Sequence, residues 1–397
     1  MADFSLMIAP RKLSRLVLVC SKWPPQYGGP GIYYYRNMPF LRSLADHVHV
    51  VTRRGDLPPA TGPNEPGVTF STLGSPCTRI GQYLFGAKVA AIVLWHAIKM
   101  RSPCGVIFAG GNAMNGWREA ATLLPWVGVP IIVENVLITA DDGDSILRTR
   151  FRGFTRFAAR RLRSFCPVST GLLESVERAF PEATCTLLPY GVDLEANAPP
   201  TDAAKSQARE ALGLPTDAFI TITLGAVHER KGQLPLIEAW LEWIRATGET
   251  NARLLVVGPR ETPAYSQRID EVVAAAGSHG ATVVFTGQTA DSAKYLRAAD
   301  VYVTASHAEG LPISIVEALA HGLPVACRGL EGVTNDFMYG HAVTPISPWS
   351  VEAFAAAMNG LHDVRVRHVA SRDARDVAEQ RFDVRRRVAA LGELFTV

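Results

Sequence analysis

The sequence predicts an α/β protein with two doubly wound parallel sheets, each in a domain of its own. Short runs of apolar and β-branched residues alternate with helical patterns along the whole chain. The runs are continuously apolar, which is typical of strands buried on both faces and covered by the intervening helices. With 397 residues, the chain is also long enough for two domains of about 150 residues each.

The predicted strands form two sets of five. The first set covers residues 15–20, 47–52, 105–110, 129–135 and 164–169, and the second covers 218–226, 252–259, 282–288, 301–306 and 324–328. Residues 195–207 lie between the sets and are polar and proline-bearing, as expected of a linker. We expect a first domain over residues 1–195 and a second over 196–377, facing a cleft that receives ligands at the carboxyl ends of the strands.

Composition favours an ordinary globular protein of a reducing compartment. Hydrophobic residues make up 48% of the chain and charged residues 19%. Six cysteines occur without a C-x-x-C pair, which favours neither a zinc site nor a disulfide framework. The longest apolar segment, residues 84–98, contains Lys88 and is shorter than the roughly 20 residues of a membrane span. We expect a cytoplasmic protein without a secretion signal.

Charge is distributed unevenly between the two halves. Residues 1–196 contain 21 Lys and Arg against 14 Asp and Glu, a net charge of +7, whereas the remainder contains 19 against 23, a net charge of −4. Seven arginines lie in residues 148–165, "RTRFRGFTRFAARRLRSF", with aromatic residues at near-helical spacing. Such a segment, Arg148 to Arg163, would lie on the anionic inner face of a membrane. Alternatively, its aromatic face packs on the sheet and its arginines are solvated.

The stretch "AEGLPISIVEALAHGLPV" places Glu309 and Glu317 eight positions apart, after the predicted strand 301–306. A helix is expected to begin near Ser314 as its N-cap and to stop at Gly322, so Glu309 would lie in the loop and Glu317 in the first turn. The helix N-terminus favours a phosphate, and the carboxylates would lie about 12 Å apart at helical rise. A nucleotide diphosphate sugar has this shape, although a loop glutamate and a dipole-complementing glutamate are the simpler explanation.

A second element is the basic turn Arg230-Lys231-Gly232, which follows the predicted strand 218–226 and precedes an amphipathic helix. Two adjacent cations at the mouth of a strand can bind a diphosphate through charge-assisted hydrogen bonds. They can also stabilise a leaving nucleotide as its charge develops. The alternative is a solvated basic turn.

Several segments together resemble the retaining glycosyltransferases of family four, which have the GT-B fold. The resemblance covers nearly the whole chain and rests on "PPQYGGPGIYYYRNMPFLRSL", "LPYGVD", the "RKG" turn, "FTGQTADSAKYLRAADVYVTAS" and "SHAEGLPISIVEALAHGLPVACRGLEGV". It implies two Rossmann-like domains, with the acceptor bound by the first and the donor by the second. It also implies that a last helix within residues 378–397 crosses back onto the first domain.

The resemblance assigns roles to individual residues. Glu309 would contact the donor sugar and Glu317 the ribose, while Arg230 and Lys231 would bind the diphosphate. The turn Gly28-Gly29 would close over the phosphates from the other domain. The remaining donor-binding residues implied by the motif are Gly310, Leu311, Pro312 and Ile313.

Two departures from the family pattern concern the chemistry. Gly225 is followed by Ala226 where many members carry an arginine, so Arg230 is expected to take over part of that task. Residues 129–145, "VPIIVENVLITADDGDS", contain no histidine where many members have one. The resemblance implies a front-face mechanism in which the leaving phosphate takes the acceptor proton. The polar groups available to orient an acceptor hydroxyl are Glu134, Asn135, Asp141 and Asp142, of which Asp141 and Asp142 are favoured, although a capped turn explains these two as well.

The function expected from these residues is transfer of a hexose from a nucleotide-diphosphate sugar to an acceptor hydroxyl, with retention of configuration. The acceptor would be a carbohydrate or a lipid-linked molecule of cell-envelope synthesis, without nucleic acid as a partner and without a strict requirement for metal. The alternatives are a catalytically weak sugar-nucleotide-binding protein and an epimerase of the same fold, which would react without an acceptor. A metal-binding D-x-D at Asp142–Asp144 and a dinucleotide-dependent oxidoreductase are further alternatives, but the latter requires a third glycine where Tyr34 stands.

Overall fold

The computed structural model describes residues 12–26, 28–54, 59, 66–74, 79–100, 104–110, 116–124, 128–149 and 151–396. Tyr27, Cys77 and Arg150, which belong to segments discussed above, lie outside these ranges. The chain divides into two compact units. Unit 1 comprises Met1–Tyr190 and Val384–Val397, and unit 2 comprises Gly191–Asp383.

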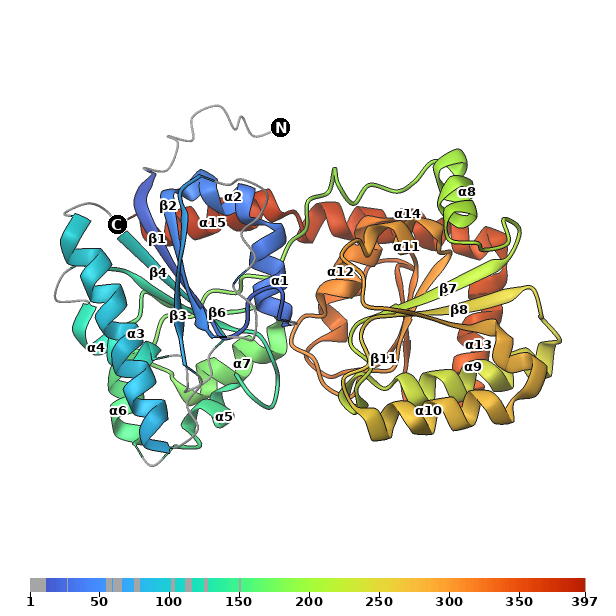
Figure 1. The fold of residues 1–397 in the computed structure, drawn as a ribbon, viewed down its shortest axis with the longest axis horizontal. Coiled ribbons are helices and arrows are strands. Elements are labelled where there is room, and N and C mark those ends of the chain that lie inside the picture. The colour runs from blue at the N-terminus through green and yellow to red at the C-terminus, as the bar shows by residue number, and fades with distance from the viewer. Residues whose placement is uncertain are drawn as a thin grey trace. The chain divides into compact units, whose positions relative to one another are not determined.

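Unit 1 contains a six-stranded parallel sheet in the order β3-β2-β1-β4-β5-β6 (Figure 1). The strands are β1 (Leu13–Cys20), β2 (Ala45–Arg53), β3 (Val68–Leu73), β4 (Cys104–Ala109), β5 (Ile131–Asn135) and β6 (Ser164–Pro167). The central strands β1 and β4 are almost completely buried, because their apolar side chains point to helices on both faces.

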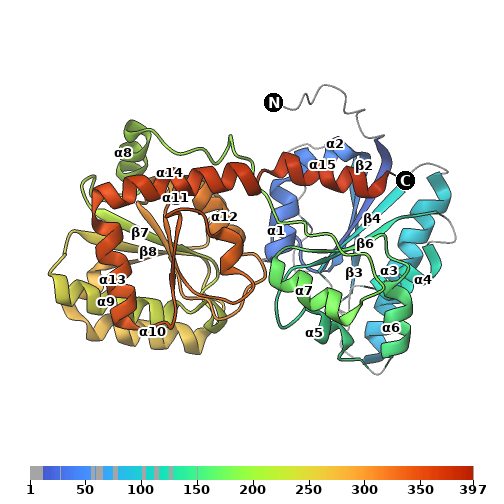
Figure 2. The same cartoon turned by 180° about the vertical axis from the view of Figure 1, so that it is seen from behind.

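The helices of unit 1 form a layer on each face of its sheet. They are α1 (Gly29–Arg36), α2 (Met38–Leu44), α3 (Arg79–Met100), α4 (Trp117–Leu123), α5 (Gly143–Leu147), α6 (Arg152–Ala159), α7 (Thr170–Ala179) and α15 (Val384–Phe395). Helices α3, α4 and α6 bury their inner faces in one core cluster with the sheet. The last helix, α15, packs against α2, as Figure 2 shows. Within the described residues, no helix has the length and apolar character that a membrane span requires.

Unit 2 repeats this architecture with the strand order β12-β11-β10-β7-β8-β9, again all parallel. Its strands are β7 (Phe219–Leu224), β8 (Ala252–Val257), β9 (Val283–Gly287), β10 (Val301–Thr304), β11 (Val325–Arg328) and β12 (Val343–Ile346). Its helices are α8 (Asp202–Ala211), α9 (Gln233–Thr247), α10 (Pro263–Ala275), α11 (Ala293–Ala298), α12 (Ile313–Ala320), α13 (Val351–His362) and α14 (Val364–Arg381). Three short 3₁₀ helices complete it: η3 (Glu229–Lys231), η4 (Gly277–Thr282) and η5 (Thr334–Phe337).

The structure adds two strands that sequence periodicity did not predict. Both β3 and β12 lie at an edge of their sheets. Most residues of β3 are half-buried, and β12 buries only its two end residues. These two edge strands therefore lack the continuous apolar run by which the other ten strands were recognised.

The predicted linker at residues 195–207 is wrong in its second part. Residues 202–207 belong to α8, which begins after an N-cap at Thr201, whose hydroxyl accepts a hydrogen bond from the N–H of Ala204 at 3.2 Å. The helix is bound to unit 2 through Arg209, which donates to the Asp300 carboxylate at 2.8 Å. This contact is between residues far apart in sequence, so local composition did not indicate it.

The basic segment of unit 1 does not form one continuous helix. Helix α6 ends at Ala159, and Phe165 is fully buried in β6. Phe151, Phe154 and Phe157 are 54%, 41% and 48% exposed. The alternative in which these three aromatic side chains pack on the sheet is therefore wrong, because the residues that α6 turns inward are Thr155, Ala158 and Ala159.

The order of each sheet identifies where a ligand would bind. Strand order reverses between β1 and β4 in unit 1 and between β7 and β10 in unit 2. In open α/β sheets, ligands bind beyond the carboxyl ends of the strands at such a switch point. The loops that follow β7 and β10 are those that contain Arg230, Lys231 and Glu309.

Candidate functional site

Three charged side chains meet at the switch point of unit 2. Arg230 and Lys231 lie in η3, which follows β7, and Glu309 lies in the loop after β10. The ammonium of Lys231 donates to Oε1 of Glu309 at 2.6 Å, and the guanidinium of Arg230 donates to Oε2 at 3.1 Å. The two sequence motifs, 78 residues apart, therefore form one ion-pair cluster.

Glu309 is the buried member of this cluster. Its side chain is 8% exposed, whereas those of Lys231 and Arg230 are 22% and 35% exposed. Burial alone would raise the pKa of this carboxyl, but Lys231, Arg230 and a hydrogen bond from Ser306 outweigh that effect and lower it below its ordinary value of 4.5. Glu309 is thus an ionised acceptor for hydroxyl groups, held between two cations that reach the surface.

A pH dependence of stability follows from the lowered pKa of Glu309. Its pKa is lower in the folded than in the unfolded chain, so the stability it contributes is complete above about pH 4.5 and is lost as pH falls through the folded-state value. We expect the difference in unfolding free energy between wild type and Glu309→Gln to be constant from pH 7 to 5 and to shrink below it. Urea denaturation across this pH range measures the difference in unfolding free energy. If the difference grows on acidification, the pKa of Glu309 is not lowered in the folded chain.

The backbone of η3 is fixed against the loop after β10. The N–H of His307 donates to the carbonyl of Arg230 at 2.7 Å, and the guanidinium of Arg230 donates to the carbonyl of Ala308, also at 2.7 Å. Gly232 ends the turn at φ +68°, and a Cβ added there would lie 2.1 Å from the carbonyl oxygen of Ala305. A glycine is therefore required for the two loops to approach this closely.

Replacing Gly232 by alanine is expected to separate the two loops. The added Cβ meets backbone rather than a flexible side chain, so the turn must move and carry Arg230 and Lys231 away from Glu309. We expect a weakening of nucleotide diphosphate binding by about tenfold or more, because a misplaced charged group loses its hydrogen bonds. Isothermal titration calorimetry measures this, with Gly248→Ala as the matched control at φ +70° and no neighbour within 4 Å. Equal losses in both variants would assign the effect to backbone strain alone.

A second set of hydrogen bonds, which sequence reasoning missed, supports the basic turn. His228 caps η3, its Nδ1 accepting from the N–H of Arg230 at 3.0 Å. The buried Gln233 donates to the carbonyl of Ala226 at 2.9 Å and accepts from the N–H of His228 at 3.2 Å. The sequence did offer one signal for this network, because Gln233 is a polar residue at the first inward position of the amphipathic helix α9. Sequence spacing did not show which groups it would bind.

The helix of the E-x7-E motif differs in detail from the prediction. Helix α12 begins at Ile313 with Pro312 at its N-cap. Ser314 is not the N-cap, because its hydroxyl lies inside the first turn and accepts from the Tyr302 hydroxyl at 2.8 Å. Glu317 is therefore in the second turn rather than the first, and it is 7% exposed. The stop is as predicted, with Gly322 following the helix at φ +71°.

The four residues predicted to bind the donor lie between Glu309 and helix α12 or at its start. Gly310, Leu311 and Pro312 are buried, and Ile313 is half-buried at the first helical position. The first N–H groups of a helix have no acceptor within it and can bind an anion. Roles for Glu317 and these four residues in donor binding stay predictions.

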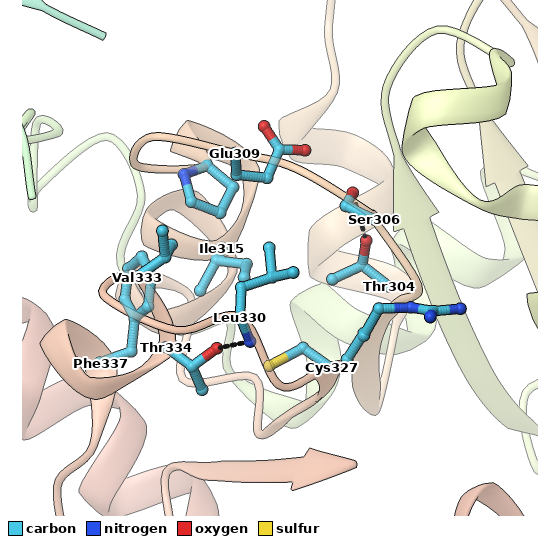
Figure 3. A pocket seen from close by; sticks show the side chains of 11 residues that line it. Thr304, Ser306, Glu309, Ile315, Cys327, Leu330, Val333, Thr334 and Phe337 are labelled. Carbon is cyan, nitrogen blue, oxygen red and sulfur yellow. Dashed lines mark hydrogen bonds between the residues drawn. The ribbon is translucent and has the colours of Figure 1, made fainter. Parts of the chain in front are cut away.

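A pocket open to solvent lies beside Glu309 (Figure 3). Its wall combines Thr304, Ser306 and Arg328 with an apolar set, Ile315, Cys327, Leu330, Val333 and Phe337. The Glu309 carboxylate points away from Leu330 and Phe337 (Figure 3). Arg328 donates to the carbonyl of Ala305 at 3.1 Å, so it also holds the loop after β10. Burial raises the pKa of the Cys327 thiol to about 12, which favours the protonated thiol over the thiolate.

In unit 1, the turn Gly28-Gly29 lies beyond the carboxyl end of β1. Gly28 is the N-cap of α1 with extended backbone, and Gly29 is the first helical residue. The closest backbone approach is at Gly31, where a Cβ would lie 2.0 Å from the carbonyl oxygen of Lys22. The sequence therefore places glycines where α1 must meet the loop after β1, and closure of Gly28-Gly29 over phosphates stays a prediction.

The acidic segment after β5 contains one strained residue and one helix cap. Asp142 caps α5, accepting from the N–H and the hydroxyl of Ser145 at 2.9 and 2.6 Å, so the capped-turn alternative holds for it. Asp141 is 4% exposed, and its carbonyl accepts from the side chain of Asn135 at 2.7 Å. Thr139 has φ +79°, which a β-branched residue rarely adopts and which is more frequent at functional sites.

One interpretation of this segment, that Glu134 orients an acceptor hydroxyl, is corrected. Glu134 is fully buried and bound by Arg387, Tyr34 and Tyr190, so it has no free face for an acceptor hydroxyl. In the D-x-D alternative, Asp142 is already engaged as the helix cap through both of its oxygens, and metal binding by Asp142 and Asp144 stays a prediction.

Comparisons with known proteins relate this chain to glycosyltransferases. Residues 218–363 match the family model of the group 1 glycosyl transferases. The chain is 32% identical over 286 residues to a D-inositol 3-phosphate glycosyltransferase of Saccharomonospora viridis, covering 68% of this chain and 64% of the relative. It is 27% identical over 218 residues to an Escherichia coli UDP-Gal:alpha-D-GlcNAc-diphosphoundecaprenol alpha-1,3-galactosyltransferase, covering 53% of each. The matches span about half to two thirds of the length of these curated relatives.

The fold extends over the whole chain. The crystal structure of Anabaena HepE in complex with UDP and glucose superposes with a TM-score of 0.71 at 18% identity, covering 96% of this chain and 98% of HepE. At this identity the likeness shows the fold alone. The chain therefore has the GT-B fold, and its residues 218–363 are similar to the group 1 glycosyl transferases.

Proposed function

We propose that the protein is a retaining glycosyltransferase of family four that moves a hexose from a nucleotide-diphosphate sugar to an acceptor hydroxyl. The observation that carries the proposal is the cluster of Arg230, Lys231 and Glu309 at the switch point of unit 2. Two cations beside one buried carboxylate match a ligand in which an anionic diphosphate adjoins a hydroxyl-rich sugar.

The proposed reaction assigns each group a task. Arg230 and Lys231 bind the diphosphate and stabilise it as the bond from the anomeric carbon to the phosphate oxygen breaks. Glu309 accepts hydroxyl groups of the hexose and holds it in place. The acceptor oxygen forms its new bond on the same face of the sugar, and its proton passes to the leaving phosphate oxygen. The two side-chain cations supply the charge that a metal would otherwise provide, so we expect no strict requirement for metal.

The acceptor is assigned to unit 1, whose loop after β5 contains Asp141. The E. coli relative is described as acting on a diphosphoundecaprenol-linked sugar, and the S. viridis relative on D-inositol 3-phosphate. We propose a carbohydrate or lipid-linked acceptor of cell-envelope synthesis for this chain. The cysteines that the structure describes are free thiols, which fits a reaction in the cytoplasm.

The test is a thermal-shift and calorimetric screen of the full chain against UDP, GDP, ADP and their common sugars, with magnesium or with EDTA. We expect one diphosphate to raise the melting temperature in EDTA as well as in magnesium. A ligand at 100 times its dissociation constant stabilises by about 2.7 kcal/mol. Nicotinamide dinucleotides serve as negative controls.

Activity assays separate the remaining alternatives. Transfer to an added acceptor, with the product linkage determined by NMR, is expected to give the same anomeric configuration as the donor. Inverted configuration would refute the retaining mechanism. Isomerisation of the donor without acceptor would indicate an epimerase, and diphosphate binding without any turnover would favour the binding-protein alternative.

A further inference from the structure

Helix α3 of unit 1 exposes an apolar stripe to solvent. Leu84, Trp95 and Ile98 are 57%, 62% and 60% exposed, and the exposed Ala87 and Ala91 lie between them. Steps of three and four residues place all five on one side of the helix. The opposite side, with Phe85, Val89 and Val93, is buried in the core of unit 1. Apart from the exposed Lys88, the described residues named here make the helix apolar on both sides, which is unusual for a water-exposed helix.

Exposed apolar side chains also occur on α4 and α6. Helix α4 packs against α3 and against α6, and all three lie on the same side of the sheet in both views (Figures 1 and 2). Leu123 at the end of α4 is 50% exposed, and the phenylalanines of α6 are those reported above. We call the exposed set Leu84, Trp95, Ile98, Leu123, Phe151, Phe154 and Phe157 the apolar face. Several exposed apolar side chains on packed neighbouring helices are typical of an interaction site.

Arginines border the apolar face. Arg148, Arg152 and Arg156 are exposed, and the Arg161 guanidinium lies 4.6 Å from the ring centre of Phe157. Helices α3, α4 and α6 contain a single carboxylate, Glu119. It is half-buried between α4 and α3, and burial raises its pKa. Arg160, next to this set, pairs with Glu182, and the described face as a whole contains more cationic than acidic side chains.

We infer that the apolar face docks unit 1 onto the surface of an anionic lipid bilayer. Phenylalanine, tryptophan and leucine side chains enter the boundary between headgroups and acyl chains, while arginines bind the negative headgroups. A second copy of the chain fits less well, because a two-fold contact would bring the arginines of one copy against those of the other. The inference depends on unit 1 alone, so it does not rest on the donor site of unit 2.

The test is flotation of the full chain with vesicles of phosphatidylcholine alone or with phosphatidylglycerol added, at low and high salt. We expect binding to the anionic vesicles only, and weaker binding at high salt. Phe154→Ser with Phe157→Ser is expected to abolish it. Arg152→Gln with Arg156→Gln is expected to weaken it by about 30-fold, at roughly fivefold for each arginine near the surface. Circular dichroism checks that the variants fold.

Helix α14 of unit 2 provides matched controls, because it exposes both apolar residues and arginines. Val364 and Val366 are 67% and 46% exposed, and Arg365 and Arg372 are exposed on the same helix, but Asp373, Asp376 and Glu379 accompany them. Val364→Ser with Val366→Ser, and Arg365→Gln with Arg372→Gln, should bind vesicles as wild type does. Equal binding to neutral vesicles, or equal loss in the α14 variants, would overturn the inference. So would a wild-type dimer that the phenylalanine variant converts to monomer without any vesicle binding.

Discussion

Substituting Glu309 by glutamine is expected to lower the turnover of hexose transfer by about 100-fold or more, the scale for losing one preorganised electrostatic group in a buried site. The amide keeps the shape of the carboxylate but loses its charge. It can accept from a hydroxyl on one side only, and it no longer attracts Lys231 and Arg230 at 2.6 and 3.1 Å. The position of the hexose and that of the diphosphate-binding cations therefore depend on the same side chain.

Lys231→Ala is expected to lower the turnover of hexose transfer by a similar factor, in this case by removing a cation rather than the carboxylate. The leaving diphosphate would lose one of two cations, and Glu309, 8% exposed, would keep Arg230 alone. The release of nucleoside diphosphate in the presence of acceptor measures turnover for both variants. Glu229→Gln is the matched control, since Glu229 lies in the same short helix and is exposed. Near-normal turnover in both Glu309→Gln and Lys231→Ala would refute the assignment of the site.

The sequence predicted that Arg230, Lys231 and Glu309 lie in one site, but it did not predict that their side chains are in direct contact. Each motif lies after an apolar run, and carboxyl ends of parallel strands share one edge of a sheet, so the sequence indicated a common site. It did not show that β7 and β10 are neighbours, because strand order depends on packing between residues about 80 positions apart. The requirement for glycine at Gly232 comes from the same neighbouring pair, through Ala305.

The sequence could not predict the burial of side chains that are covered by segments far away along the chain. Periodicity placed apolar side chains on one side of α6 but could not tell which side the sheet covers, so Phe154 and Phe157 were open to either interpretation. Edge strand β3 was missed because its residues are only half-buried. Glu134 was considered an acceptor-binding residue because the sequence did not show that its carboxylate is already paired. Its partner, Arg387, is 253 residues away in sequence.

The pairing of Glu134 with Arg387 leads to the largest stability effect that we expect. Glu134 ends β5 and Arg387 lies in α15, and their side chains are 0% and 2% exposed. The hydroxyls of Tyr34 and Tyr190 also donate to this carboxylate, at 2.5 and 3.1 Å. Burial alone would lower the pKa of Arg387, but the Glu134 carboxylate raises it above its ordinary value. The C-terminal helix is thus joined to unit 1 by a buried charge with several partners.

Arg387→Met or Glu134→Gln alone is expected to destabilise unit 1 by about 3–5 kcal/mol, because each leaves a buried charge without its partner. The double variant removes both charges and should be less destabilised than the two singles combined. Urea denaturation measures all three. Asp46→Asn serves as the control, since it breaks the exposed pair of Lys12 and Asp46, 47% and 61% exposed, and should cost less than about 1 kcal/mol. Additive effects in the double variant would mean that the two residues act separately and that α15 is held by its apolar contacts alone.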